Sequence, residues 1–138
     1  MSDDDRFERG LEKIKDVYAG AVVTAPKGAM AFSDIMLETL FAEVWTRDVL
    51  SMRDRRLILL GAIMALGESM TFEIQAKAAL RKGELDPDEL REVIVFAVHY
   101  VGYPRAAPLV GVVEKCIAEV AQEKKEQEKG EKEKQDEA

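Results

Sequence analysis

The chain has 138 residues, of which 47% are hydrophobic and 34% charged, and this composition predicts one packed globular domain rather than a disordered chain. Its 27 acidic and 20 basic residues give a net charge of −7, which argues against nucleic acid and anionic membrane surfaces as partners because both need a basic face. One Cys and one His exclude an internal disulfide, a Cys-x-x-Cys redox pair and a multi-histidine metal centre within one subunit.

Two helices are predicted in the first third of the chain. An apolar stripe with spacings of four, three and four residues indicates the first helix. The members of this stripe are Phe7, Leu11, Ile14 and Tyr18. A loop marked by Pro and Gly follows at residues 24–28, and the second helix is predicted from about Ser33 to Arg47.

The third helix is predicted to be the central one. Ser51 and Asp54 fit a capping box, with the hydroxyl at the cap and the acid three residues later. The run Leu57–Leu66 that follows is apolar on nearly all sides, so we expect this helix to be buried, and Gly67 is placed to end it. A fourth helix is predicted from about Thr71 to Lys82.

The fifth helix has the clearest start signal in the chain. In Asp86-Pro-Asp-Glu89 the first Asp caps, Pro takes the first helical position and Glu closes the box. This helix is predicted to end at Gly102, and a sixth begins at Tyr103-Pro104. Six helices with short connections predict an all-α domain over residues 1–121.

The two ends of the chain are charged. Residues 122–138 are almost only Glu, Lys, Gln, Asp, Gly and Ala, so they cannot bury a face; Glu–Lys pairs favour transient helix, and we expect disorder. The start at Met1 is acidic with no apolar stretch behind it, so no secretory signal is predicted. Every apolar run is shorter than the roughly 20 residues of a membrane helix. We therefore expect a cytoplasmic protein.

The third and fifth helices are apolar on more sides than a small bundle covers. A domain of this size buries only about two-thirds of its surface. A subunit interface would hide the remaining apolar surface, so we predict a homo-oligomer.

Few side chains could carry chemistry, and each has a structural alternative. His99 lies on the fifth helix among apolar residues, either as a packed histidine or as a proton carrier in an apolar pocket. Glu43 and Arg47 are four residues apart on the second helix. They form either a surface ion pair or the charged lining of a pocket beside Trp45.

The remaining candidates are a group of arginines and three packing residues. The arginines are Arg47, Arg53, Arg55 and Arg56. They are either solvated charges at a helix start, or one or two of them clamp a carboxylate, which a guanidinium binds bidentately. Cys116 repeats in step with apolar neighbours and is predicted to be a core residue. Trp45 and Tyr100 are more typical of packing than of pocket walls.

Several segments stand in an order and spacing that is specific only when they are taken together. They are Phe41-Ala-Glu-Val-Trp-Thr-Arg47, Asp54-Arg-Arg-Leu-Ile-Leu-Leu60, Ala65-Leu-Gly67, Ala78-Ala-Leu-Arg-Lys-Gly83, Asp88-Glu-Leu90 and His99-Tyr-Val-Gly-Tyr-Pro104. In this order they resemble the carboxymuconolactone decarboxylase family, over roughly residues 5 to 121.

The resemblance implies a helical fold shared with the alkylhydroperoxidase D proteins and assembly as a trimer or hexamer. It implies loss of CO2 from a small carboxylated lactone or a related oxygenated acid of aromatic degradation, with no cofactor. In such a reaction an Arg holds the carboxylate that stays, a hydrogen-bonding group stabilises the enolate, and an acid reprotonates carbon.

The chain departs from the family at two places. The peroxidase branch has Cys-x-x-Cys and then His where this chain has Glu68, Thr71 and Gln75, so thiol peroxidase activity is not expected. Decarboxylase relatives keep a His where this chain has Gln75, and an amide cannot exchange protons as an imidazole does. We expect His99, beside the Tyr-x-Gly-x-Pro motif, to compensate.

One hypothesis is therefore an enzyme in which Glu43, Arg47, Gln75 and His99 converge on one pocket, which a neighbouring subunit could complete. Arg47 would anchor a substrate carboxylate, His99 or Glu43 would move the proton, and Gln75 would polarise a carbonyl. Trp45 and Tyr100 are assigned to substrate binding, and no metal is expected. The alternatives are a non-catalytic helical oligomer or binding module, or a different small-molecule activity on the same fold.

Overall fold

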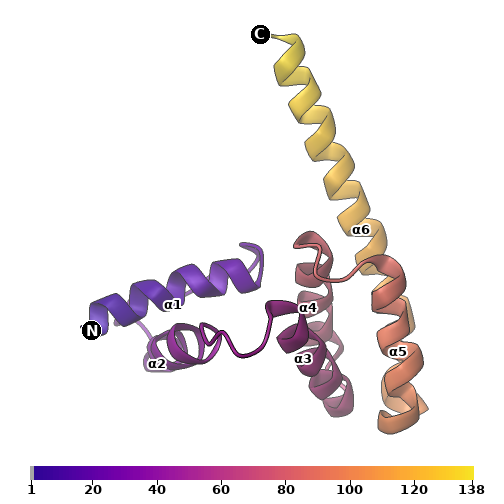
Figure 1. Ribbon diagram of the computed structural model, residues 1–138, viewed down its shortest axis with the longest axis horizontal. Coiled ribbons are helices and arrows are strands. Elements are labelled where there is room, and N and C mark those ends of the chain that lie inside the picture. The colour runs from indigo at the N-terminus through magenta and orange to yellow at the C-terminus, as the bar shows by residue number, and fades with distance from the viewer. Residues whose placement is uncertain (1) are drawn as a thin grey trace. The chain divides into compact units, whose positions relative to one another are not determined.

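The computed structural model describes residues 2–138, and Met1, where the acidic start begins, lies outside the described residues. The chain is built of helices (Figure 1). In order they are α1 (Asp3–Val17), α2 (Ala31–Met36), the π-helical segment η1 (Leu37–Val44), α3 (Met52–Leu66), α4 (Ser69–Arg81), α5 (Pro87–Val101) and α6 (Tyr103–Asp136). No strand occurs over residues 2–138, which confirms the all-α class.

The contacts divide the chain into two compact units, Met1–Arg55 and Arg56–Ala138, where the sequence predicts one domain over residues 1–121. Over the described part of the chain, no helix is both long and apolar enough to cross a lipid bilayer.

In the first unit, α1 packs against η1. The helix begins earlier than its apolar stripe indicates, because Ser2 and Asp5 form a capping box around its first turn. Gly10 lets the two elements approach closely: a Cβ at this position would lie 1.9 Å from the carbonyl oxygen of Leu37. The apolar residues of α1 and η1 then form a small core of their own. Its buried members are Phe7, Ile14, Val17, Leu37, Phe41, Ala42 and Trp45.

The predicted second helix is found as two successive pieces, α2 and η1. The last turn of η1 is closed by the backbone N–H of Trp45, which donates to the carbonyl of Leu40 at 2.9 Å, five residues back. Such wide turns are rare and are not visible in hydrophobic spacing. The ring of Trp45 lies nearly parallel to that of Phe41, with centroids 6.4 Å apart.

The second unit contains the larger core, in which α4 and α5 pack on α6. The predicted caps are confirmed: Ser51 Oγ accepts from the backbone N–H of Asp54 at 3.0 Å, and Asp86 forms a capping box with Glu89. The core is formed by buried side chains of all four helices. They include Leu60, Met64, Phe72, Ala76, Leu90, Ile94, Leu109, Val113, Cys116 and Val120.

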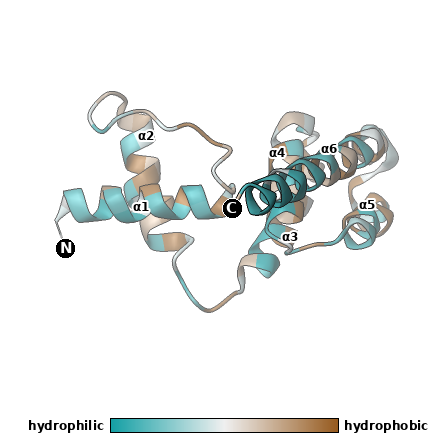
Figure 2. Cartoon of the chain, turned by 90° about the horizontal axis from the view of Figure 1, so that it is seen from above, coloured by the Kyte–Doolittle hydropathy of each residue, from teal (hydrophilic) through white to brown (hydrophobic). Residues whose placement is uncertain are grey.

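The third helix is predicted to be central and buried, and in the single chain it is buried on one side only, which leaves apolar surface uncovered as its all-round apolar sequence indicates. Helix α3 buries one face, which carries Leu60, Ile63 and Met64. On other sides Ile58 and Leu66 are 62% and 75% exposed. Figure 2 shows brown and teal segments on the helices of this unit, so these helices carry both apolar and polar residues.

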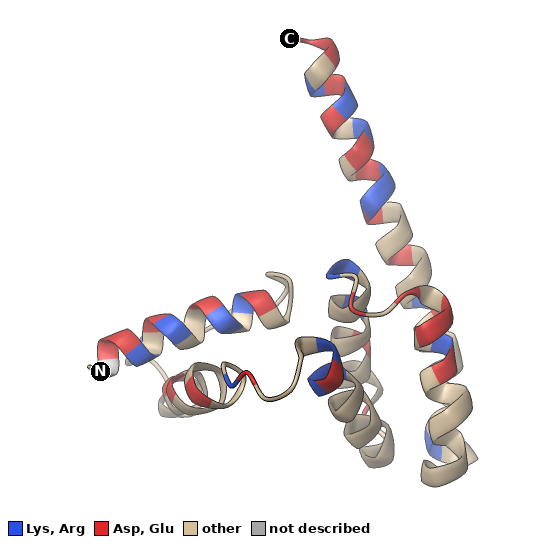
Figure 3. Cartoon of the chain, in the orientation of Figure 1, with Lys and Arg blue, Asp and Glu red and all other residues tan. Residues whose placement is uncertain are grey.

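Helix α6 extends 34 residues and continues to Asp136, where the composition predicts disorder. Val120 is its last buried residue, and acidic and basic side chains alternate along the part that follows (Figure 3). The physical reason is that the packed first half of α6 supplies the helical nucleus, so the charged half only has to propagate it. Spacings such as Gln122 to Glu126, joined at 3.2 Å, support that propagation.

A ladder of opposite charges joins α4 to α6. The pairs are Glu73 with Lys115 at 2.8 Å, Lys77 with Glu119 at 2.5 Å and Arg81 with Glu123 at 2.7 Å. Residue numbers rise together on both helices, so α4 and α6 run parallel. Successive pairs are four residues apart, which is about one helical turn. We call these six side chains the charge ladder.

Candidate functional site

A buried polar cluster lies inside the second unit. The guanidinium of Arg56, which is 0% exposed, donates from Nε to Glu84 Oε1 at 2.8 Å and from its terminal nitrogens to Glu84 Oε2 at 3.4 Å and Gln75 Oε1 at 2.5 Å. The side chains of Gln75 and Glu84 are also buried. We call Arg56, Gln75 and Glu84 the buried trio.

Three elements bring the buried trio together. Arg56 lies one turn before Leu60 on the inward face of α3, and Gln75 lies on the buried face of α4. Glu84 follows Gly83, whose positive φ of +70° ends α4 and turns the chain back toward α3. The trio is therefore held by two rigid helices and one tight turn.

The hydrogen bonds of the trio determine what Gln75 can offer. Its Oε1 accepts from Arg56, so its Nε2 is the donor end of the amide. A carboxylate and a guanidinium buried together lose hydration, and good geometry is needed to offset that loss. The pair meets this need because two nitrogens of the Arg56 guanidinium donate to the two carboxylate oxygens of Glu84.

A second feature of this unit is an apolar groove between α5 and α6, which we call the His99 groove. It is open to solvent and has a volume of about 310 Å³. Its walls are Ile94, Val95, Val98, His99, Tyr103, Ala107 and Val110. His99 Nδ1 lies 3.3 Å from the carbonyl oxygen of Phe96; a carbonyl only accepts, so Nδ1 carries the hydrogen of this bond and Nε2 is left for proton exchange.

The buried trio and His99 occupy different places in the second unit. Glu84 lies just before the start of α5, whereas His99 lies near its end, about 18 Å further along the helix axis. Gln75 does not line the His99 groove. Tyr100, 81% exposed, lies beside Phe96 with ring centroids 5.5 Å apart, on the outside of α5.

The other predicted site residues belong to the first unit. Glu43 is half-exposed and pairs with Arg6 at 3.5 Å, rather than with Arg47. Trp45 is 7% exposed and its ring packs on Phe41, so it forms core rather than a pocket wall. Arg47 is exposed just beyond the end of η1.

Sequence reasoning missed the importance of Arg56 and Glu84. Arg56 was distinguishable from the other arginines by its phase, since it lies four residues before Leu60 and seven before Ile63 on the face that α3 buries. Arg55, its neighbour, points elsewhere and donates to the backbone carbonyl of Trp45 at 3.2 Å. Glu84 carries no local signal, because only the tertiary fold brings this loop residue to α3.

The structure offers little support for thiol or metal chemistry. Cys116 is buried as predicted, and burial raises the pKa of its thiol to about 11, which keeps it protonated at neutral pH. Within residues 2–138, no three His, Cys, Asp or Glu side chains are grouped closely enough to hold a metal ion.

The fold is that of a small all-α protein. Residues 31–115 match the sequence model of the carboxymuconolactone decarboxylase family. The match spans more than half of the chain, so the chain belongs to this family. The matched residues 31–115 include the buried trio and the residues that line the His99 groove.

One named relative has a related activity. The chain is 27% identical over 116 residues to a nitrosuccinic acid decarboxylase of Metarhizium robertsii, and the match covers 80% of each protein. The family and this relative together support a decarboxylase-like role.

Proposed function

We propose that the protein is a cofactor-free decarboxylase of small carboxylic acids in which the departing carboxylate lies next to an electron-withdrawing group. The observation that carries this proposal is the family match over residues 31–115. A carboxylated lactone or related oxygenated acid of aromatic degradation meets the description. Nitrosuccinic acid, which gives the relative its name, does so as well, because it is a dicarboxylic acid bearing a nitro group.

The chemistry of this class requires little from the protein. Breaking the C–C bond to the carboxylate releases CO2 and leaves an electron pair that a carbonyl or nitro group delocalises. The protein must hold the remaining carboxylate, stabilise the charge on oxygen and return a proton to carbon. An apolar surrounding strengthens each of these electrostatic interactions.

The His99 groove supports the proton-transfer role best. It places an imidazole among aliphatic walls, and the Phe96 carbonyl orients that ring so that Nε2 is the nitrogen that exchanges protons. We assign reprotonation of carbon to His99. Arg47 and Glu43 belong to the other compact unit, and Gln75 is buried against Arg56 away from the groove, so we assign them no step at His99.

A homo-oligomer is part of this proposal, and a trimer or hexamer is the form expected for the family. Large apolar side chains that line the His99 groove are exposed, including Val95, Tyr103 and Val110 at 56%, 65% and 54%. Exposed apolar patches of this kind mark interaction surfaces. A neighbouring subunit on this face would enclose the groove and exclude water from it. We place the protein in the cytoplasm.

The test is decarboxylation by the purified full-length chain. Nitrosuccinic acid and 4-carboxymuconolactone are supplied separately, CO2 release and ultraviolet absorbance are followed, and an enzyme-free sample gives the spontaneous rate. We expect saturable turnover of at least one acid, lowered by about 10²-fold or more in His99→Gln. Glu92→Gln, an exposed position on the same helix, is the matched control and should keep full activity.

A binding module is the second candidate function. The observation that favours it is Gln75: the family resemblance implies a His at this position, and this chain has an amide that Arg56 holds inside the buried trio, so the position has no proton carrier. If neither acid is turned over and the folded oligomer nevertheless binds either acid saturably, with affinity lowered in Arg47→Gln, the binding module is the better description. If the folded chain neither turns over nor binds either acid, the proposed substrate class is wrong.

A further inference from the structure

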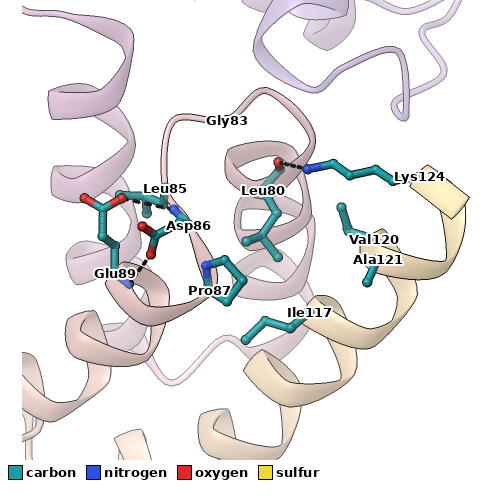
Figure 4. A pocket seen from close by; sticks show the side chains of 10 residues that line it. All are labelled: Leu80, Gly83, Leu85, Asp86, Pro87, Glu89, Ile117, Val120, Ala121 and Lys124. Atoms are coloured by element: carbon teal, nitrogen blue, oxygen red, sulfur yellow. Dashed lines mark hydrogen bonds between the residues drawn. The ribbon is translucent and has the colours of Figure 1, made fainter. Parts of the chain in front are cut away.

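A cavity separate from the His99 groove and the buried trio lies where α4 ends, α5 begins and α6 passes both (Figure 4). Its volume is about 380 Å³, more than twice the roughly 150 Å³ of an apolar cavity that accepts benzene. Leu80, Leu85 and Val120 are at most 4% exposed, and their side chains make the cavity continuous with the core. Ile117 and Pro87 complete the apolar lining (Figure 4).

The charged groups at the rim of this cavity differ in the hydrogen bonds that they make. Asp86 accepts from the backbone N–H of Glu89 at 2.8 Å, and Glu89 accepts from that of Asp86 at 3.1 Å, so both carboxylates serve the start of α5. Across the cavity, Lys124 Nζ donates only a long bond of 3.4 Å to the carbonyl oxygen of Leu80 at the end of α4 (Figure 4). An ammonium has three donors, so Lys124 is the rim group that is able to take a further acceptor.

We infer that this cavity, which we call the Lys124 cavity, binds a small amphiphilic carboxylate, with an aromatic or aliphatic body against Leu80 and Val120 and its carboxylate at Lys124. The apolar floor provides burial of the ligand body. The ammonium provides the charge complement on the side of the cavity opposite Asp86 and Glu89, which stay negatively charged (Figure 4). The site lies outside the proposed reaction groove, so the inference goes beyond the proposed function and stands whether or not decarboxylation is found.

The experiment uses the full-length chain and two probes that differ in one group. 3-Phenylpropionate carries the carboxylate, and 3-phenylpropan-1-ol has the same apolar body without the charge. Binding is followed by the methyl NMR signals of Leu80, Ile117 and Val120. We expect saturable shifts with the carboxylate, and binding of the alcohol that is roughly three- to fivefold weaker.

Two variants and one control make the test specific. Lys124→Met should bring the carboxylate down to the affinity of the alcohol, whereas Lys125→Met, the exposed next residue that does not line the cavity, should change nothing. Ala121→Phe places a ring at the mouth from an exposed helix position and should abolish binding of both probes. Circular dichroism checks that each variant is folded.

Several outcomes would overturn the inference. Equal binding of both probes, unchanged in Lys124→Met, would show an apolar cavity with no carboxylate specificity. Shifts that persist in Ala121→Phe would place the probe elsewhere. Absence of binding in wild type, together with a lower sedimentation mass of Ala121→Phe, would show that a second copy of the chain covers the cavity.

Discussion

The buried trio and the charge ladder use the same kinds of side chain in opposite surroundings. In the trio, Arg56 and Glu84 are 0% and 8% exposed at their side chains and meet at 2.8 Å. In the ladder, Arg81 and Glu123 meet at 2.7 Å but are 25% and 39% exposed. Distance alone would rank the two pairs as equals, yet water screens the second pair and not the first.

The difference is in what happens when one partner is lost. A ladder residue that loses its partner is hydrated by water in the same position, so the free energy of unfolding changes little. A trio residue that loses its partner stays buried as an unpaired charge, which costs several kcal/mol even though the intact pair contributes little net stability. Tight geometry inside the core is therefore a requirement of the fold at this point.

The largest expected effect comes from removing the charge of Glu84. Glu84→Gln should lower the free energy of unfolding by about 3 kcal/mol, because the Arg56 guanidinium remains buried without its anion. Urea denaturation measures this change. The double variant Arg56→Met, Glu84→Leu removes both charges and should recover most of the loss; equal destabilisation by the single and double variants would contradict the argument.

A smaller effect is expected at Gln75. Gln75→Leu keeps the side chain similar in size but makes it apolar, which removes the acceptor at 2.5 Å from Arg56. The unfolding free energy should fall by about 1–3 kcal/mol, the usual cost of a buried donor that loses its partner. The neighbouring surface substitution Lys82→Gln is the control, and an equal loss there would mean that the effect is not specific to the core.

The ladder should respond weakly and with a dependence on salt. Arg81→Met removes the pair with Glu123, and we expect a loss of about 0.5 kcal/mol in dilute buffer. In about 1 M NaCl, where the screening length falls to about 3 Å, wild type and variant should become nearly equal. Urea denaturation at both salt concentrations measures this, and a loss that salt leaves unchanged would indicate lost packing of the arginine stem.

The smallest effect concerns acid. Hydrogen bonds from Lys115 and then Lys77 hold the pKa of Glu73 below its ordinary value of 4.5, and Arg81 does the same for the pKa of Glu123. A carboxylate whose folded pKa is lowered stabilises the fold above its unfolded value and loses that contribution as pH falls through the folded one. The free energy of unfolding measured with urea should therefore fall below about pH 4.5, and it should fall less steeply in the double variant Glu73→Gln, Glu123→Gln.

The sequence was informative wherever structure is decided locally. The caps at Ser51 and Asp86 were correct because a cap is a bond between a side chain and a backbone group three residues away. The all-α class followed from spacing, and the motifs identified the family that the match over residues 31–115 confirms. The π-helical turn at Leu40 to Trp45 was missed because the buried residues Leu37, Phe41 and Trp45 are four residues apart, a spacing that also fits an α-helix.

The candidate site was harder to predict because it depends on contacts distant in sequence. Gln75 was singled out, but its partner Glu84 is a loop residue with no pattern of its own, and Arg56 was one of several arginines. His99 was identified as a residue among apolar neighbours, and in the structure it is an exposed residue that lines an apolar groove; its proton-carrying role is a prediction. Trp45, assigned to substrate binding, is packed in the core of its unit.

The length of α6 has a practical consequence for handling the molecule. From Val120 to Asp136 the helix rises about 24 Å beyond its last buried residue. A fluorophore or affinity tag fused after Ala138 would therefore be carried on a charged rod, clear of both the His99 groove and the Lys124 cavity. The same rod would increase hydrodynamic drag, so gel filtration would overestimate the mass of a subunit, and light scattering would not.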